Sequence, residues 1–230
     1  AQAVNNKDAL QSMGKETSWD ECVSEFDTDL FAKQVASVGA GYVIFTMVQV
    51  TSYLAAPNKA FNEITGYKDG EACSSIDMVE KLYDSLKKHD IDLILYFPCD
   101  GPSKDPKARE AFGGIKYGEP KPHITTEFVK KWAKVIREYS LRYGDKVKGW
   151  WLDGCYYNIG YTDKKLEIIA DACRAGNSKA LVSSNLYGLV DDYASIIDHV
   201  RAGCPTDDFS FGEMWGFKDL PYAPTIRNCR

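Results

Sequence analysis

The chain has 230 residues and a formal net charge of −5, from 28 lysine and arginine residues against 33 aspartate and glutamate residues. Hydrophobic residues make up 44% and charged residues 27%, a composition that indicates a globular domain and excludes a disordered or fibrous chain. The acidic balance disfavours nucleic-acid binding, and no apolar run approaches the roughly 20 residues of a membrane-spanning helix.

The first half of the chain predicts alternating helices and strands after an ill-defined N-terminal extension, 1–18. Ser18 and Glu21 have the spacing of a capping box, and Asp27 or Thr28 can cap a helix over 30–38. The pattern then predicts a buried strand at 42–45, a loop at 54–70, an amphipathic helix at 79–86, a strand at 91–97 and a long loop at 99–123.

The second half continues the alternation. It predicts a helix at 128–139, a strand at 147–152, a helix at 166–173, a strand at 180–184, a helix at 192–202 and a fifth strand at 209–211. Strands separated by helices indicate βαβ units and a parallel α/β sheet. A TIM-type (β/α)8 barrel and a doubly wound sheet both fit. A barrel typically needs about 250 residues, so we expect a single domain over 1–230 that is slightly short of a full barrel.

The cysteines and the absence of cofactor motifs indicate the compartment of the protein and which cofactors to expect. Of the seven cysteines, the closest two, Cys155 and Cys173, are 173 − 155 = 18 positions apart, so no paired-cysteine zinc or redox motif is present. Disulfides in a secreted, extracellular or periplasmic protein are favoured over buried thiols. The sequence has no glycine-rich phosphate loop and no histidine pair with metal-ligand spacing, so we expect neither a nucleotide cofactor nor a metal.

The residues just after each predicted strand are the candidate site, because parallel α/β folds bind ligands at the carboxyl ends of their strands. Asp153 ends a strand beside aromatic residues, and a carboxylate beside aromatic faces is what sugar chemistry requires. The candidate substrate-binding residues are Gln49, Tyr53, Tyr96, Trp151, Tyr156, Tyr157, Asn185 and Trp215. The alternative interpretation is that Asp153 caps the next turn and the tryptophans are core.

Glu213 is the second candidate catalytic carboxylate, two strands beyond Asp153. Retaining glycosidases hold their two carboxyl groups about 5–5.5 Å apart and inverting enzymes about 6.5–9.5 Å apart. Alternate strands of a barrel can meet either distance. The competing interpretation is that Glu213 is an exposed loop residue.

These residues resemble a known family. The segment 19–215 is similar to the catalytic barrel of glycoside hydrolase family 29, the α-L-fucosidases, and looks like a divergent member. The match is carried by 26–27, 39–46, 52–53, 57–58, 139–144 and 150–156, most specifically by the Trp-Leu-Asp-Gly run at 151–154. The resemblance implies a TIM-like barrel and a retaining mechanism with Asp153 as the nucleophile.

The chain departs from that family in two ways. The family's sugar-binding His-His pair is replaced by Gln49 and Val50. The resemblance also registers the chain on strands two to six of eight. We therefore expect either a piece of a longer polypeptide or a barrel completed by a second chain or a missing segment.

Two functions follow as hypotheses. The leading one is a retaining glycosidase, α-L-fucosidase-like, in which Asp153 attacks the anomeric carbon and Glu213 acts as general acid and base. The alternative is a catalytically inactive carbohydrate-binding or structural assembly protein on a degenerate barrel. A glycan is the expected ligand in the first case and the main candidate in the second.

Overall fold

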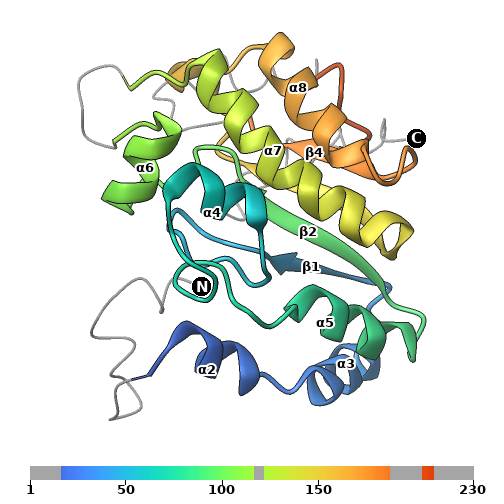
Figure 1. Ribbon diagram of the computed structural model, residues 1–230. Helices are drawn as coiled ribbons and strands as arrows, with labels where there is room; N and C mark the ends of the chain where they lie inside the picture. The colour runs from blue at the N-terminus through green and yellow to red at the C-terminus, as the bar shows by residue number, and fades with distance from the viewer. Residues whose placement is uncertain (1–16, 117–121, 187–203, 210–230) are drawn as a thin grey trace, which may run out of the picture.

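The computed structural model describes residues 17–116, 122–186 and 204–209. Short helices and parallel strands alternate along these segments (Figure 1). In chain order the elements are α2 (Trp19–Ser24), α3 (Thr28–Ser37), β1 (Tyr42–Thr46), α4 (Lys59–Thr65), α5 (Met78–Lys87), β2 (Asp92–Pro98), α6 (Pro106–Phe112), α7 (Thr126–Tyr143), the 3-10 turn η2 (Gly144–Lys146), β3 (Val147–Asp153), the 3-10 turn η3 (Tyr157–Ile159), α8 (Asp163–Arg174) and β4 (Leu181–Ser184).

The four strands form one parallel sheet in the order β1-β2-β3-β4. Right-handed crossovers that always step the same way put their helices on one face of the sheet, and the order β1-β2-β3-β4 steps the same way throughout. A doubly wound sheet would reverse its strand order at a switch point. Figure 1 shows α5, α7 and α8 following one another in chain order alongside the sheet. Within the described residues the sheet has four strands and does not close.

The core lies between the sheet and its helices. The side chains of β2 that face the helices, among them Leu95 and Phe97, are fully buried. Trp132 of α7 packs its ring 5.3 Å from that of Phe97, and its indole N–H donates to the carbonyl of Pro98 at 2.7 Å. This hydrogen bond satisfies a polar atom that burial would otherwise leave without a partner. Helix α7 is thereby fixed against the end of β2.

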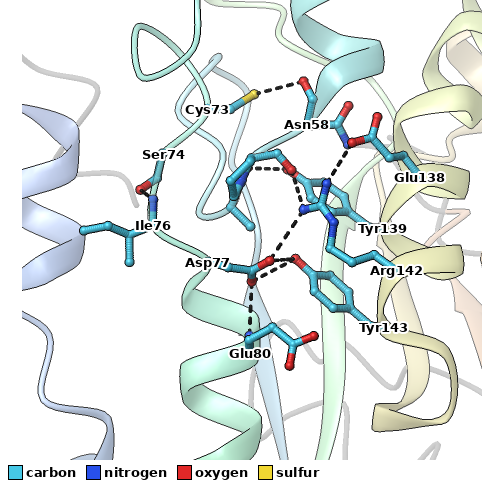
Figure 2. A network of polar contacts seen from close by, with 12 residues as sticks. Asn58, Cys73, Ser74, Ile76, Asp77, Glu80, Glu138, Tyr139, Arg142 and Tyr143 are labelled. Carbon is cyan, nitrogen blue, oxygen red and sulfur yellow. Dashed lines mark hydrogen bonds and ion pairs between the residues drawn. The ribbon is translucent and has the colours of Figure 1, made fainter.

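A partly buried polar network ties α7 to the start of two other helices (Figure 2). The guanidinium of Arg142 lies 2.8 Å from the carboxylate of Glu138 and 3.5 Å from that of Asp77. Asp77 caps α5 and accepts the Tyr143 hydroxyl at 3.0 Å. Glu138 accepts two backbone N–H groups at the start of α4, from Lys59 at 2.9 Å and from its neighbour at 2.7 Å. One arginine therefore orders three helix ends.

The sequence predicted much of this architecture. The Ser18–Glu21 capping box is present, and Asp27 caps α3. The four strands expected near 42, 91, 147 and 180 are confirmed as β1 to β4. The helices expected at 79–86, 128–139 and 166–173 correspond to α5, α7 and α8. The α/β class with a parallel sheet is therefore confirmed.

Two segments predicted as loops contain helices instead. The 54–70 segment holds α4, which Asn58 caps and which ends at Gly66 in a left-handed conformation. The 99–123 segment holds α6, which begins with Asp105 as its cap and Pro106 in its first turn. Both helices have seven residues, too few to show a clear apolar period. Their caps were the signals that could have revealed them.

The last predicted elements lie largely outside the described residues. This holds for the helix at 192–202 and for all of the fifth strand except Phe209. The neighbouring Asp208 lies along the edge of β4 that faces away from β3, where its backbone N–H donates to the carbonyl of Val182 at 2.8 Å. Its carboxylate accepts the Val182 N–H and pairs with Arg174 of α8, both at 2.8 Å. The chain thus reaches the edge where a fifth strand was expected.

The expected disulfides are not found in the described part of the chain. Its six cysteines, at 22, 73, 99, 155, 173 and 204, are all free thiols. Five of the six are buried, and burial raises the pKa of Cys73 to about 12, so these cysteines act as small core side chains. Cys229 lies outside the described residues. No helix within the described segments is long and apolar enough to cross a membrane.

Candidate functional site

Asp153 is the last residue of β3, at the carboxyl edge of the sheet. Its neighbour across the ladder is Pro98, the last residue of β2. On the other side of β3, the parallel ladder with β4 continues past the ends of both strands. The Asn185 N–H donates to the carbonyl of Leu152 at 2.7 Å, and the Cys155 N–H donates to that of Asn185 at 3.1 Å. Asp153 and Asn185 are therefore held side by side by backbone hydrogen bonds.

Four donors surround the Asp153 carboxylate. Oδ1 accepts the Gly154 N–H at 2.8 Å, the Asn185 side-chain amide at 2.9 Å and the Tyr156 hydroxyl at 3.4 Å. Oδ2 accepts the Tyr96 hydroxyl at 2.6 Å. Hydrogen bonds of this kind fix the rotamer of a carboxylate and stabilise its charge. The side chain is half-buried, so part of it remains open to solvent.

Tyr96 connects Asp153 to Gln49 in the loop after β1. Its ring lies 5.2 Å from that of Trp151, and its hydroxyl lies 3.1 Å from the side-chain nitrogen of Gln49. Burial, and then the adjacent Asp153 carboxylate, raise the pKa of Tyr96 well above its usual range. The tyrosine therefore stays a neutral hydrogen-bond donor at any physiological pH.

The structure brings together most of the side chains predicted for the site, but not all. Gln49, Tyr96, Trp151, Tyr156 and Asn185 lie around Asp153, directly or through Tyr96. Gln49 was expected to contact sugar hydroxyls, whereas its amide bonds to Tyr96.

Two of the predicted side chains make other contacts. Tyr53 packs against Trp19, with ring centroids 5.8 Å apart. The Tyr157 hydroxyl donates to Asp163 at 2.8 Å. Glu213 and Trp215 lie outside the described residues, so their distances to Asp153 stay predictions.

Asp100 is a further strand-end carboxylate beside Asp153, and it was not among the candidate site residues predicted from the sequence. It lies two positions beyond β2 and is 3% exposed. A Cβ placed on Gly154 would lie 2.9 Å from Oδ1 of Asp100, so this second carboxylate sits directly behind the Asp153–Gly154 peptide. The available signal was its place at a strand end, where the Cys99-Asp100-Gly101 run follows β2.

The loops after β1 and β2 meet beside this edge of the sheet. The Lys104 N–H donates to the carbonyl of Val50 at 2.8 Å, which closes the loop that carries Gln49 against the loop that carries Asp100. In the described segments no group of three or more histidine, cysteine, aspartate or glutamate side chains is arranged to hold a metal ion. The described site holds the hydrogen-bonded Asp153 carboxylate with aromatic, amide and hydroxyl neighbours, and the buried Asp100 carboxylate behind it.

Comparisons with known proteins place this geometry on a recognised fold. The chain is similar to endo-fucoidan hydrolase MfFcnA4 of glycoside hydrolase family 107, with a TM-score of 0.58 and 17% identity over 87% of this chain and 35% of that one. It is also similar to MfFcnA9 of the same family, with a TM-score of 0.59 and 16% identity over 84% and 40% of the two chains. The third similar structure is an α-L-fucosidase of family 29 from Bacteroides thetaiotaomicron, trapped as a covalent intermediate. Its TM-score is 0.50 and its identity is 16%, over 76% of this chain and 40% of that one.

No family model and no curated protein matches the sequence. The structural similarities are at low identity and show the fold alone, and the chain spans 35–40% of the three solved chains named above. They include families 107 and 29, so the resemblance to family 29 holds at the level of a shared fold and does not single out that family. The chain has an α/β fold that is similar to part of the solved endo-fucoidan hydrolases and of the solved α-L-fucosidase.

Proposed function

We propose that the chain carries the nucleophile-bearing part of a retaining glycoside hydrolase that acts on a fucose-containing glycan. Asp153 is the nucleophile in this proposal. The observation that carries it is the Asp153 carboxylate, clamped by four donors at the carboxyl edge of a parallel sheet. The similarity to endo-fucoidan hydrolases and fucosidases supports the choice of sugar.

The chemistry follows from the type of group and its place. A carboxylate that attacks an anomeric carbon must be charged, and its position must not drift as the sugar binds. The hydrogen bonds from Tyr96, Asn185 and the Gly154 backbone hold the Asp153 carboxylate in place. Retention also requires a general acid and base, for which Glu213 remains the sequence-based candidate.

The experiment is covalent trapping. The full chain would be incubated with 2-deoxy-2-fluoro-fucosyl fluoride, whose fluorine slows hydrolysis of the glycosyl-enzyme ester, and analysed by intact-mass and peptide mass spectrometry. We expect one added fluorofucosyl group on the peptide that contains Asp153. In parallel, a panel of aryl glycosides, including the α-L-fucoside, and fucoidan would be tested for hydrolysis.

Matched variants make the result specific. Asp153→Asn should abolish labelling and lower any turnover by a factor on the order of 10⁴ or more, because it removes the attacking oxyanion. Asp145→Asn, at the exposed turn before β3, should behave as the wild type. Binding of fucosylated glycans without labelling or turnover of any glycoside would instead establish the non-catalytic alternative.

A further inference from the structure

We propose that Tyr96 and Gln49 form a positioning pair that leaves Oδ2 of Asp153 as the attacking oxygen. Once that oxygen has reacted, Gln49 accepts the hydrogen bond that Tyr96 had donated to it. This inference rests on the proposed function and deepens it. It assigns Gln49 a role behind the nucleophile instead of a sugar contact.

The two carboxylate oxygens of Asp153 are unequally occupied. Oδ1 accepts three hydrogen bonds, from Gly154, Asn185 and Tyr156. Within the described residues, Oδ2 accepts one, from Tyr96. Each carboxylate oxygen has roughly two lone-pair positions for acceptance, so Oδ1 is saturated and Oδ2 keeps a lone pair for bond formation.

Tyr96 has one hydroxyl proton and two acceptors within reach. Oδ2 of Asp153 is 2.6 Å away and Oε1 of Gln49 is 3.2 Å away. While Asp153 is charged, the Tyr96 hydroxyl donates its hydrogen bond to the carboxylate, because charge-assisted hydrogen bonds are the stronger ones. The Gln49 amide nitrogen, 3.1 Å from the same hydroxyl, then donates to the tyrosine oxygen.

Glycosylation changes which acceptor is the better one. In the first step Oδ2 forms a bond to the anomeric carbon, the bond from that carbon to the leaving oxygen breaks, and the leaving oxygen takes a proton from the general acid. Oδ2 becomes an uncharged ester oxygen and a weak acceptor. The Tyr96 hydroxyl then turns to Oε1 of Gln49, so that no buried donor is left unpaired.

Deglycosylation reverses the exchange. Water attacks the anomeric carbon and gives its proton to the general base, and the bond from that carbon to Oδ2 breaks. Charge develops on Oδ2 as it leaves, and the Tyr96 hydroxyl returns to stabilise it. Tyr96 and Gln49 therefore act on the nucleophile and favour the second step more than the first.

The test separates the two steps in Tyr96→Phe, with Gln49→Leu as the second variant. Labelling by 2-deoxy-2-fluoro-fucosyl fluoride reports glycosylation, and recovery of activity after removal of the reagent reports deglycosylation. For Tyr96→Phe we expect recovery of activity to slow by roughly 10- to 100-fold, because one hydrogen bond to a charged group is lost. Labelling should slow less, and kcat and KM should fall together. Gln49→Leu should slow recovery by a few fold.

The control is Tyr42→Phe, an exposed tyrosine on the same face of the sheet but at its opposite end, which should match the wild type. Recovery at the wild-type rate in Tyr96→Phe, or a rise in KM with kcat unchanged, overturns the inference and leaves the proposed function intact. If circular dichroism shows Tyr96→Phe unfolded, recovery in Gln49→Leu decides. A wild type that is neither labelled nor active removes the proposed function and this inference with it.

Discussion

Gly154 allows the chain to turn immediately behind the proposed nucleophile, and its missing side chain makes room for a second carboxylate. Its φ is +71°, in the left-handed region, and a Cβ there would meet the Asp100 carboxylate oxygen at 2.9 Å and the Asp100 nitrogen at 3.1 Å. Two separate costs would therefore follow from any larger residue. One is the backbone conformation, and the other is the collision with Asp100.

Gly154→Ala tests how much of the site depends on this close approach. Gly39 is the matched control, because its φ is +74° and a Cβ there would meet nothing within 4 Å. We expect Gly39→Ala to lower the free energy of unfolding by about 1 kcal/mol, the left-handed cost alone. Gly154→Ala should lower it by about 2–4 kcal/mol, since overpacking adds to that cost. Urea unfolding of both variants measures the difference, and equal losses would show that Asp100 moves aside freely.

Some neighbours of Asp153 could be predicted from the sequence and others could not. Asp153, Tyr96 and Asn185 were expected to be neighbours because parallel strands end at a common edge, and they are in contact. The partner of Gln49 was not predictable, because the choice between Tyr96 and a ligand depends on the path of the loop after β1. The burial of Asp100 against Gly154 likewise follows from two loops that are distant in the sequence.

At the scale of elements, α4 and α6 differ in kind from the helices that the sequence predicted. Each has seven residues and is capped by an asparagine or aspartate side chain. A helix this short is not stable by itself, so packing decides whether it forms. Phe61 of α4 and Phe112 of α6 lie 5.4 Å apart, and both contact Trp132 of α7. That aromatic cluster exists only in the folded chain, which explains why the sequence indicated loops.

Gly176, in the turn after α8, lies close against Ser140 of α7, and this contact can be tested by substitution. Its N–H donates to the Ser140 hydroxyl at 2.9 Å, and that hydroxyl donates to the carbonyl of Cys173 at 2.7 Å. A Cβ on Gly176 would overlap the carbonyl oxygen of Ser140, so the turn after α8 must move away from α7. We expect Gly176→Ala to lower the free energy of unfolding by about 2–3 kcal/mol.

Gly41→Ala is the control for that variant. Its φ is not in the left-handed region, and a Cβ there would meet nothing within 4 Å. Its effect on the free energy of unfolding should stay within about 0.5 kcal/mol, as measured by urea unfolding. Similar curves for the two variants would mean that the turn after α8 yields easily, and that the close approach of α7 and α8 at Ser140 is not a constraint on the fold.

At the scale of the whole molecule, the helices cover one face of the sheet and the other face is partly open. Tyr42 and Ile44 of β1 and Leu181 of β4 are 59%, 39% and 46% exposed. By the strand register, Tyr42 and Ile44 lie on the same face as Tyr96. The strand register therefore places the partly open apolar face and the candidate site on the same side of the sheet. The carboxyl edge of that face carries the polar site, whereas its amino end is apolar.

The edge of β4 gives the folded molecule a pH dependence that can be measured. Burial raises the pKa of Asp207 to about 6, and the like charge of Asp208 acts in the same direction. The pKa of an aspartate in an unfolded chain is about 3.9. Because the folded state holds the proton more tightly, this carboxyl contributes most to stability below about pH 4, and the contribution is lost as the pH rises to about 6.

Asp207→Asn should remove this dependence. The amide cannot ionise, so its free energy of unfolding should change less between pH 4 and 7 than that of the wild type. The difference should reach about 1–2 kcal/mol in favour of the variant at pH 7, at about 1.4 kcal/mol per pKa unit with allowance for partial exposure. Asp171→Asn on the exposed side of α8 removes a carboxyl that folding does not bury and serves as the control. Urea unfolding at several pH values measures all three proteins. Parallel curves for wild type and Asp207→Asn would show that Asp207 is solvated in the folded chain, and that the segment along β4 is less closely packed than its contacts with Val182 indicate.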